Sequence, residues 1–253
     1  MPIPKLHSPF VWFDLDDTLW DMTGNSDIAL KILFDTDPAV RKAYGAAGLA
    51  VWRKVYHAVN HDLWLGYDNG SVSRDELRME RFARPLTMAG LSRKEAEEAS
   101  RRLDRDYLLH LGDCPGCIAG AREAARRVGA AGLPMGIVSN GFREVQYRKL
   151  RSAGMEGMFD PVVLSDDAGI NKPARGFFDY ACRIAGVRPE QCVVVGDNAR
   201  TDIAGALAAG WGAAVWLDRG PTDVPAGLRA TLEGDPRCVR IEAMSELADA
   251  LGI

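Results

Sequence analysis

The sequence predicts an α/β fold in which a Rossmann-like parallel sheet carries an inserted domain made only of helices. Short β-rich apolar runs alternate with helical stretches in the second half of the chain, which is the pattern of a parallel sheet. Residues 21–112 instead show apolar residues at helical spacing. The length of 253 residues lies near the upper limit for one hydrophobic core, so two unequal domains are expected.

The sheet is predicted from five apolar runs. The first, 10–15, is too short for a helix and ends in acidic residues, which favours a buried strand. Four further strands are expected at 134–138, 161–164, 192–196 and 213–217, with helices between them at 120–128, 176–185 and 202–209.

The helical insertion is predicted to interrupt the sheet domain. It carries 14 basic and 14 acidic residues and is therefore neutral. A glycine- and proline-rich cluster at 112–116 marks a hinge where the chain returns to the sheet. The expected division is a catalytic core of residues 1–20 and 113–253 and a helical domain of residues 21–112.

Composition argues against several functional classes. The net charge of -4 provides no general positive field for a nucleic-acid polymer or an anionic membrane. The longest apolar runs are strand-sized, far below the roughly 20 residues that span a bilayer, and no secretory signal is recognised. The few cysteines, odd in number, favour reduced thiols: Cys114, Cys117, Cys182, Cys192 and Cys238. A cytoplasmic protein acting on small ligands is expected.

Four polar clusters follow predicted strands or the loops after them. They are DLDDT at 14–18, SNG at 139–141, NKP at 171–173, and GD at 196–197 with Asp202. Open parallel sheets bind ligands at the carboxyl ends of their strands. The clusters are therefore expected to converge on one crevice.

The residue types in these clusters suit phosphoryl chemistry. Asp14 and Asp16 alternate along an extended segment, so their side chains share one side and repel. Mg²⁺ would relieve that repulsion, and its preference for oxygen suits Asp14, Asp197 and a backbone carbonyl. A carboxylate can also act as a covalent nucleophile. Lys172 and Ser139 offer a positive charge and a hydrogen bond to phosphoryl oxygens.

In this order, the clusters resemble the four motifs of the haloacid dehalogenase superfamily, over nearly the whole chain. The resemblance implies that Asp14 is the nucleophile and Asp16 the general acid and base. It also implies that Ser139 and Lys172 bind phosphate. The insertion resembles the helical type 1 cap of that superfamily.

The same resemblance implies a Mg²⁺ site. Its ligands would be Asp14, Asp197 and the carbonyl of Asp16. Asp202 would orient the metal site from a second layer, and it is also placed to cap the predicted helix 202–209.

Within the superfamily, the chain resembles the pyrimidine 5'-nucleotidases of the noncanonical-nucleotide type. The resemblance rests on residues 60–70 (NHDLWLGYDNG), on Arg81-Phe82 and on 140–142 (NGF). It implies a small phosphorylated substrate, a nucleoside 5'-monophosphate with a pyrimidine base preferred. The expected substrate-binding residues are Thr18, Ser139, Asn140 and Gly141, with Trp20, Trp64 and Phe142 as candidates to stack on the base.

Other interpretations remain open. Sialic-acid 9-phosphatases and sugar-phosphate phosphatases share much of this pattern, and a phosphomutase would keep Asp16. A 2-haloacid dehalogenase is disfavoured because that class lacks an acid at the Asp16 position and needs no metal. A noncatalytic binding protein is disfavoured because the motif residues are all present. The Cys114–Cys117 pair could be a redox motif or half a zinc site, but incidental thiols at a hinge are favoured.

Overall fold

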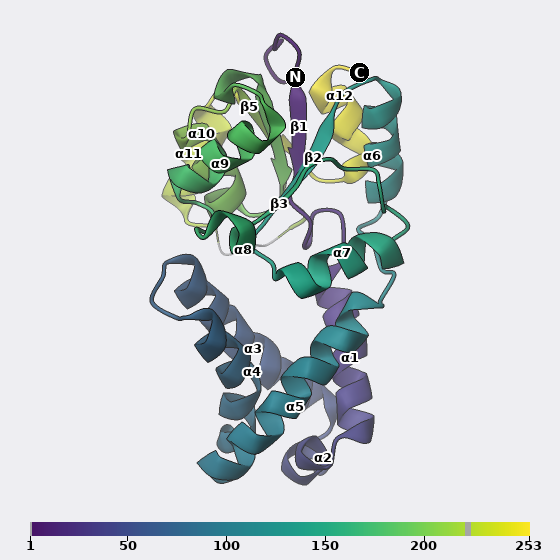
Figure 1. Ribbon diagram of the computed structural model, residues 1–253, viewed down its shortest axis with the longest axis vertical. Coiled ribbons are helices and arrows are strands. Elements are labelled where there is room, and N and C mark those ends of the chain that lie inside the picture. The colour runs from purple at the N-terminus through teal and green to yellow at the C-terminus, as the bar shows by residue number, and fades with distance from the viewer. Residues whose placement is uncertain (1, 221–223) are drawn as a thin grey trace. The chain divides into compact units, whose positions relative to one another are not determined.

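The computed structural model describes residues 2–220 and 224–253. The chain forms two compact units. The first contains Met1–Met22 and Pro115–Ile253 and carries the sheet, and the second contains Thr23–Cys114 and is helical. Figure 1 shows both units. None of the described helices is long and apolar enough to cross a membrane.

The predicted parallel α/β sheet is confirmed. Within the described residues it has six strands in the order β3-β2-β1-β4-β5-β6, and all neighbouring pairs are parallel. The strands are β1 (Phe10–Phe13), β2 (Met135–Ser139), β3 (Val162–Leu164), β4 (Cys192–Gly196), β5 (Ala213–Leu217) and β6 (Cys238–Ile241). The apolar runs do not predict β6, because its sequence CVRI includes an arginine and three of its four residues retain solvent exposure.

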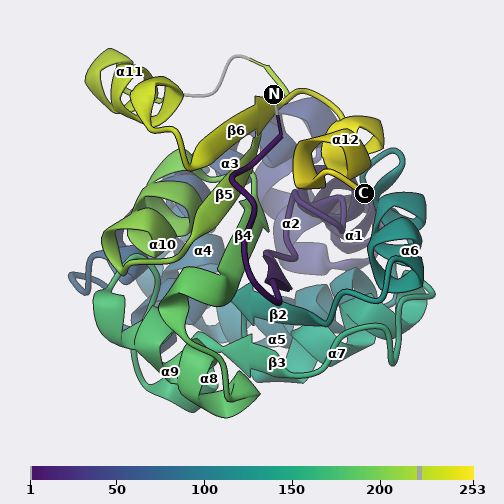
Figure 2. The same cartoon turned by 90° about the horizontal axis from the view of Figure 1, so that it is seen from above.

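Continuous apolar sequence makes the central strands. Every residue of β1, β2, β4 and β5 is buried, as expected for strands covered on both faces. Helices α9 (Arg175–Ala185) and α10 (Gly205–Ala208) cover one face, and α6 (Ala121–Ala130) and α12 (Leu247–Leu251) cover the other (Figures 1 and 2).

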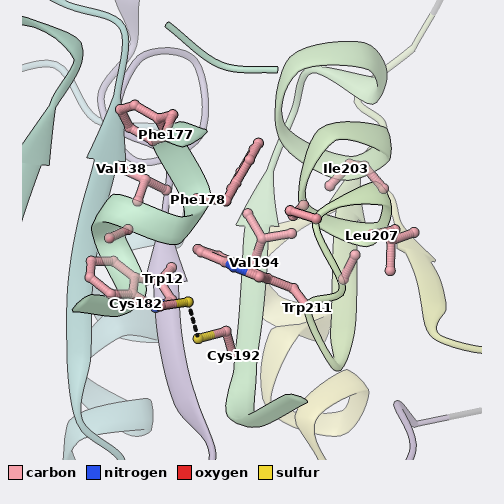
Figure 3. Close-up of a cluster of buried hydrophobic side chains, with 14 of the residues drawn as sticks. Trp12, Val138, Phe177, Phe178, Cys182, Cys192, Val194, Ile203, Leu207 and Trp211 are labelled. Carbon is pink, nitrogen blue, oxygen red and sulfur yellow. Dashed lines mark hydrogen bonds between the residues drawn. The ribbon is translucent and has the colours of Figure 1, made fainter. Parts of the chain in front are cut away.

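A large apolar cluster fixes α9 against the sheet. Trp12, Phe178 and Trp211 are buried in it together (Figure 3). Cys182 of α9 and Cys192 of β4 lie within it as free thiols whose sulfur atoms are 3.6 Å apart. All five cysteines are free.

The remaining helices of the first unit connect the strands. They are α7 (Arg143–Ser152), α8 (Ser165–Ala168) and α11 (Ala226–Gly234). Residues predicted as a helix from 202 instead begin at 199, as a π-helical segment Ala199–Ala204 that continues into α10. The Asn198 side chain caps this segment by accepting from the Arg200 and Thr201 N–H groups. The expectation that Asp202 caps it is wrong, because Asp202 lies inside the helical turn.

The second unit is a bundle of five helices among the described residues. They are α1 (Met22–Thr36, whose first residue belongs to the first unit), α2 (Pro38–Tyr44), α3 (Leu49–Asp68), α4 (Arg74–Met88) and α5 (Arg93–Gly112). Ser92 and Glu95 form a capping box at the start of α5. The aromatic core contains Trp52 and Tyr56, both fully buried, as their helical spacing predicts.

Candidate active site

The sheet topology brings the polar clusters together at the carboxyl ends of the central strands. β1 lies between β2 and β4, and later strands extend the sheet on either side. Asp14 follows β1, Ser139 ends β2 and Asp197 follows β4. Such a reversal of strand order leaves a crevice at the carboxyl ends of the two central strands. The Asp14 N–H extends the pairing by donating to the Val195 carbonyl at 2.9 Å.

The ammonium group of Lys172 is the centre of this site. It is buried and donates to Asp14 Oδ1 at 2.7 Å, to Asp202 Oδ1 at 2.6 Å and to the Val138 carbonyl at 2.9 Å. A lysine ammonium has three protons, so all three are matched by protein acceptors. Lys172 therefore ties the ends of β1 and β2 to the π-helical segment.

Burial and crowding of like charges disfavour the ionised carboxylates. Burial raises the pKa of Asp14 to about 7, with further increases from Asp202 and Asp16, while Lys172 opposes the shift. Burial, then the charges of Asp14 and Asp202, raise the pKa of Asp197 well above its ordinary value. Burial lowers the pKa of Lys172, but Asp14 and Asp202 outweigh it and hold that pKa above its ordinary value. The lysine therefore stays charged.

Three carboxylates gather where a cation would relieve this repulsion. Oxygen atoms of Asp14, Asp197 and Asp202 lie within 4.8 Å of one another. An all-oxygen donor set with excess negative charge fits Mg²⁺. The two oxygens of Asp202 already accept from Lys172 and from the Asn198 N–H at 3.1 Å. Asp14 and Asp197 are thus better placed as direct ligands, with Asp202 orienting its neighbours.

Asp197 is held by Thr18, in the turn that follows β1, and by Trp216 of β5. The Thr18 hydroxyl donates to Asp197 Oδ1 at 3.0 Å and accepts from the Asp197 N–H at 3.0 Å. The Trp216 indole donates to the Asp197 carbonyl at 3.1 Å. The hydroxyl of Thr18, expected among the substrate-binding groups, is therefore engaged with Asp197 in this structure. Trp216 has no sequence signal, because a tryptophan inside an apolar strand predicts core packing.

Asp16 faces α7 and is partly exposed. Its Oδ1 accepts from Lys149 Nζ at 2.6 Å and its Oδ2 from Gln146 Nε2 at 3.0 Å. Both partners are buried. Neither residue is a candidate from sequence: their spacing of three places both on one face of α7, but the sequence does not show that this face meets Asp16.

The SNG cluster is bound to the other motifs. Ser139 Oγ accepts from the Gly141 N–H at 3.1 Å and from Gln146 Nε2 at 2.7 Å. The Asn140 amide donates to the Lys172 carbonyl at 3.0 Å and accepts from the Lys172 N–H at 2.8 Å. Asn140, expected among the substrate-binding residues, thus holds the backbone of Lys172.

The candidate aromatic residues differ in exposure. Trp20 is fully buried, with Lys149 Nζ 4.6 Å from its ring centroid, and Phe142 is also buried. Trp64 belongs to the helical unit, is partly exposed, and contacts the Tyr67 ring edge-on with centroids 5.4 Å apart. Of the three, Trp64 retains the most solvent access for a ligand.

Comparisons with known proteins identify the family of this chain. A sequence profile of the haloacid dehalogenase-like hydrolases matches residues 11–210. Pyrimidine 5'-nucleotidase YjjG of Escherichia coli (strain K12) is 29% identical over 224 residues, 88% of this chain and 91% of that protein. Human N-acylneuraminate-9-phosphatase is 28% identical over 214 residues, 83% of this chain and 82% of that protein.

A solved structure covers the whole fold. The crystal structure of the putative HAD-hydrolase YfnB from Bacillus subtilis, bound to magnesium, matches with a TM-score of 0.78 and 25% identity, over 98% of this chain and 100% of that chain. The chain belongs to the haloacid dehalogenase-like hydrolases. The sequence-based predictions of this superfamily and of a phosphatase enzyme are confirmed.

Proposed function

We propose that the protein is a Mg²⁺-dependent phosphomonoester hydrolase that works through a phosphorylated Asp14. The observation that carries this proposal is the contact of Asp14 with a buried, fully paired Lys172, next to a cluster of carboxylates that fits a divalent cation. The charge of Lys172 keeps a carboxylate available as nucleophile in a site whose burial favours protonation.

The reaction proceeds in two steps on the residues described. In the first, an Asp14 oxygen attacks phosphorus, the bond to the leaving alcohol breaks, and Asp16 gives its proton to the departing oxygen. In the second, Asp16 takes a proton from water, the water oxygen attacks phosphorus, and Asp14 is released with inorganic phosphate. Asp14, Asp197 and the Asp16 carbonyl would hold the Mg²⁺ ion, which would neutralise charge on the phosphoryl group.

The binding roles follow from the same contacts. The Ser139 hydroxyl and neighbouring N–H groups donate to phosphoryl oxygens, and Lys172 adds positive charge beside them. Three further motif residues shape the phosphoryl site indirectly. Thr18 holds Asp197, Asn140 holds Lys172, and Gly141 leaves room for Gln146. Asp202 orients Lys172 as a second-layer group.

The substrates we propose are small nucleoside 5'-monophosphates in the cytoplasm, with pyrimidine bases preferred. The relationship to the Escherichia coli pyrimidine 5'-nucleotidase supports this choice, because it extends through the helical unit as well as the core. The motif residues contact only the phosphoryl group, so selectivity has to come from elsewhere. We assign it to the unit Thr23–Cys114, acting as a cap, with Trp64 as the candidate to contact the base.

A second candidate is a sugar phosphate, such as a sialic acid 9-phosphate. The similarity to human N-acylneuraminate-9-phosphatase supports this candidate. The two candidates differ in the leaving group and share the mechanism.

A phosphate-release screen separates these proposals. It compares pyrimidine and purine nucleoside monophosphates with sugar phosphates, each with Mg²⁺ and with excess EDTA. We expect the highest kcat/KM for a pyrimidine nucleotide, and no turnover with EDTA. A sugar phosphate that outranks every nucleotide would select the second candidate, and full activity in EDTA would contradict the metal requirement. Replacing Trp64 with Ala should raise KM for nucleotides alone.

A further inference from the structure

Helix α7 presents a buried ammonium group that the mechanism above does not use. Lys149 Nζ donates to Asp16 Oδ1 at 2.6 Å and lies 4.6 Å from the ring centroid of Trp20. Burying an ammonium is costly unless it is paired. The carboxylate of Asp16 and the face of the indole together compensate this one.

Gln146, one turn earlier on α7, is also buried and contacts two groups of the site. Its Nε2 donates to Asp16 Oδ2 at 3.0 Å and to Ser139 Oγ at 2.7 Å. The opposite orientation of the amide would place its oxygen against the Asp16 carboxylate, where neither atom can donate. A Cβ atom on Gly141 would lie 2.0 Å from Gln146 Nε2, so the amide fits only because residue 141 is glycine.

These contacts determine which way the Ser139 hydroxyl donates. The hydroxyl oxygen accepts from the Gly141 N–H and from Gln146 Nε2. A hydroxyl has two lone pairs and one proton. Since both lone pairs are occupied by donors, the proton remains available for a further acceptor, and an anionic phosphoryl oxygen is such an acceptor.

We propose that Gln146 and Lys149 are positioning residues that fix the Asp16 carboxylate in one orientation and hold Ser139 as a hydrogen-bond donor. The inference rests on the proposed function. Through α7, it links the group that handles the proton of the leaving alcohol to the group that binds the phosphoryl oxygens. Lys149 acts on Asp16 alone, whereas Gln146 acts on both Asp16 and Ser139.

Because Lys149 acts on Asp16 alone and Gln146 on both Asp16 and Ser139, variants of the two residues should differ in their kinetics. An alkyl phosphate needs a proton on its leaving oxygen, whereas p-nitrophenolate leaves readily without one. Lys149→Met should lower kcat/KM for an alkyl phosphate monoester by about 10²-fold, the lower end of a general acid's contribution. It should lower kcat/KM for p-nitrophenyl phosphate far less. Gln146→Leu should show the same asymmetry and also weaken inhibition by inorganic phosphate.

Two further variants serve as controls. Lys149→Arg keeps the charge and should recover most of the activity on the alkyl ester. Arg151→Met lies on the same helix with its side chain 67% exposed and should leave both esters unaffected. Melting temperatures are measured for every variant, and because Gln146→Leu leaves the ammonium in place, it tests the proposal separately from Lys149→Met.

The outcomes distinguish the two levels of the account. Equal losses on both esters, or full activity of both variants on the alkyl ester, would overturn the positioning roles while the hydrolase assignment stands. A wild-type chain that releases phosphate from neither ester would overturn the proposed function, and this inference with it.

Discussion

At the residue scale, the chemistry of the site depends on how the ammonium of Lys172 divides its three protons. Two of these protons are donated in hydrogen bonds to Asp14 and Asp202, and the third in a hydrogen bond to the Val138 carbonyl. Moving either carboxylate therefore disturbs the other through the lysine. Asp14 is the one we propose as nucleophile.

Asp14→Asn should abolish turnover and leave the fold intact. The amide keeps the shape of the carboxylate but lacks the negative charge that attacks phosphorus. We expect phosphate release to fall by about 10⁴-fold or more, as for other lost nucleophiles, with no loss of melting temperature. Asp35→Asn on exposed helix surface is the control. Near wild-type phosphate release by Asp14→Asn would eliminate the covalent mechanism.

Gly196→Ala tests how tightly Asp202 is held. The added Cβ would lie 2.5 Å from Asp202 Oδ2, so Asp202 would have to move away from Lys172. We expect a loss of about 1–3 kcal/mol in unfolding free energy, as for other overpacked sites, together with lower kcat. Gly227→Ala in α11 is the matched control, since its Cβ meets no atom of the described residues within 4 Å. Equal stability of the two variants, measured by denaturant unfolding, would contradict this packing.

At the element scale, the sheet could be predicted from sequence wherever burial is complete. The runs 10–15 and 192–196 are apolar because both faces of β1 and β4 are covered. Strand β6 could not be predicted, because an edge strand that is partly exposed can contain polar residues and then lacks a continuous apolar run. The start of the helix after β4 was not predicted either, because Asp197, Asn198, Thr201 and Asp202 are all residue types that can cap a helix.

The residues of the site also fall into those that the sequence predicts and those that it does not. The DLDDT, SNG, NKP and GD clusters predict the motif residues because several polar groups stand at strand ends. Gln146, Lys149 and Trp216 could not be predicted to serve the site, because each contacts an aspartate that is distant in sequence. Only the folded chain brings Gln146 to Asp16, which is 130 positions away.

The end of β5 is joined to α11 and β6 by a charge cluster. Asp218 Oδ2 accepts from Arg229 at 2.6 Å and from Arg240 at 2.7 Å. Burial raises the pKa of Asp218, but the hydrogen bonds from the two arginines outweigh it, so the pKa lies below its ordinary value of 3.8. A depressed carboxyl pKa stabilises the fold above the unfolded-state pKa, and that stability is lost as pH falls through the folded-state pKa.

Asp218→Asn should therefore lower the unfolding free energy at pH 7 by about 1–2 kcal/mol, the difference between charge-assisted and neutral hydrogen bonds. The gap between variant and wild type should begin to narrow below about pH 4, the pKa of an aspartate in the unfolded chain. It should close as pH falls further, through the lower folded-state pKa of Asp218. Glu233→Gln, whose exposed side chain lies 3.8 Å from Arg229, should change stability little. A gap that stays constant with pH would show that the charge of Asp218 is not its cause.

At the scale of the whole molecule, the acidic cluster links stability to pH and to Mg²⁺. With the pKa of Asp14 raised from 3.8 to about 7, the folded protein without metal binds more protons than the unfolded chain between these values. Its unfolding free energy should therefore fall as pH rises through this window. Mg²⁺ favours the ionised carboxylates and should reverse the loss.

Calorimetry at pH 5 and pH 8, with Mg²⁺ or EDTA, tests this linkage. We expect the larger rise in melting temperature at pH 8, and about 2.7 kcal/mol of stabilisation when Mg²⁺ is a hundredfold above its Kd. Asp197→Asn should remove most of the rise. A rise of the same size at both pH values would show that these carboxylates do not bind the metal.

In a phosphate-release assay, Ca²⁺ should inhibit turnover because its larger, looser coordination shell misplaces the nucleophile.

The central claim is a phosphoryl group bound covalently to Asp14, and acid-quenched peptide mapping during turnover tests it most directly. The tryptic peptide of residues 6–31 contains Asp14. We predict that mass spectrometry finds this peptide carrying one phosphoryl group that hydroxylamine removes, as expected for an acyl phosphate, and that Asp14→Asn yields none. A wild-type enzyme that turns over substrate with this peptide never modified, or with a hydroxylamine-resistant modification, would contradict the account.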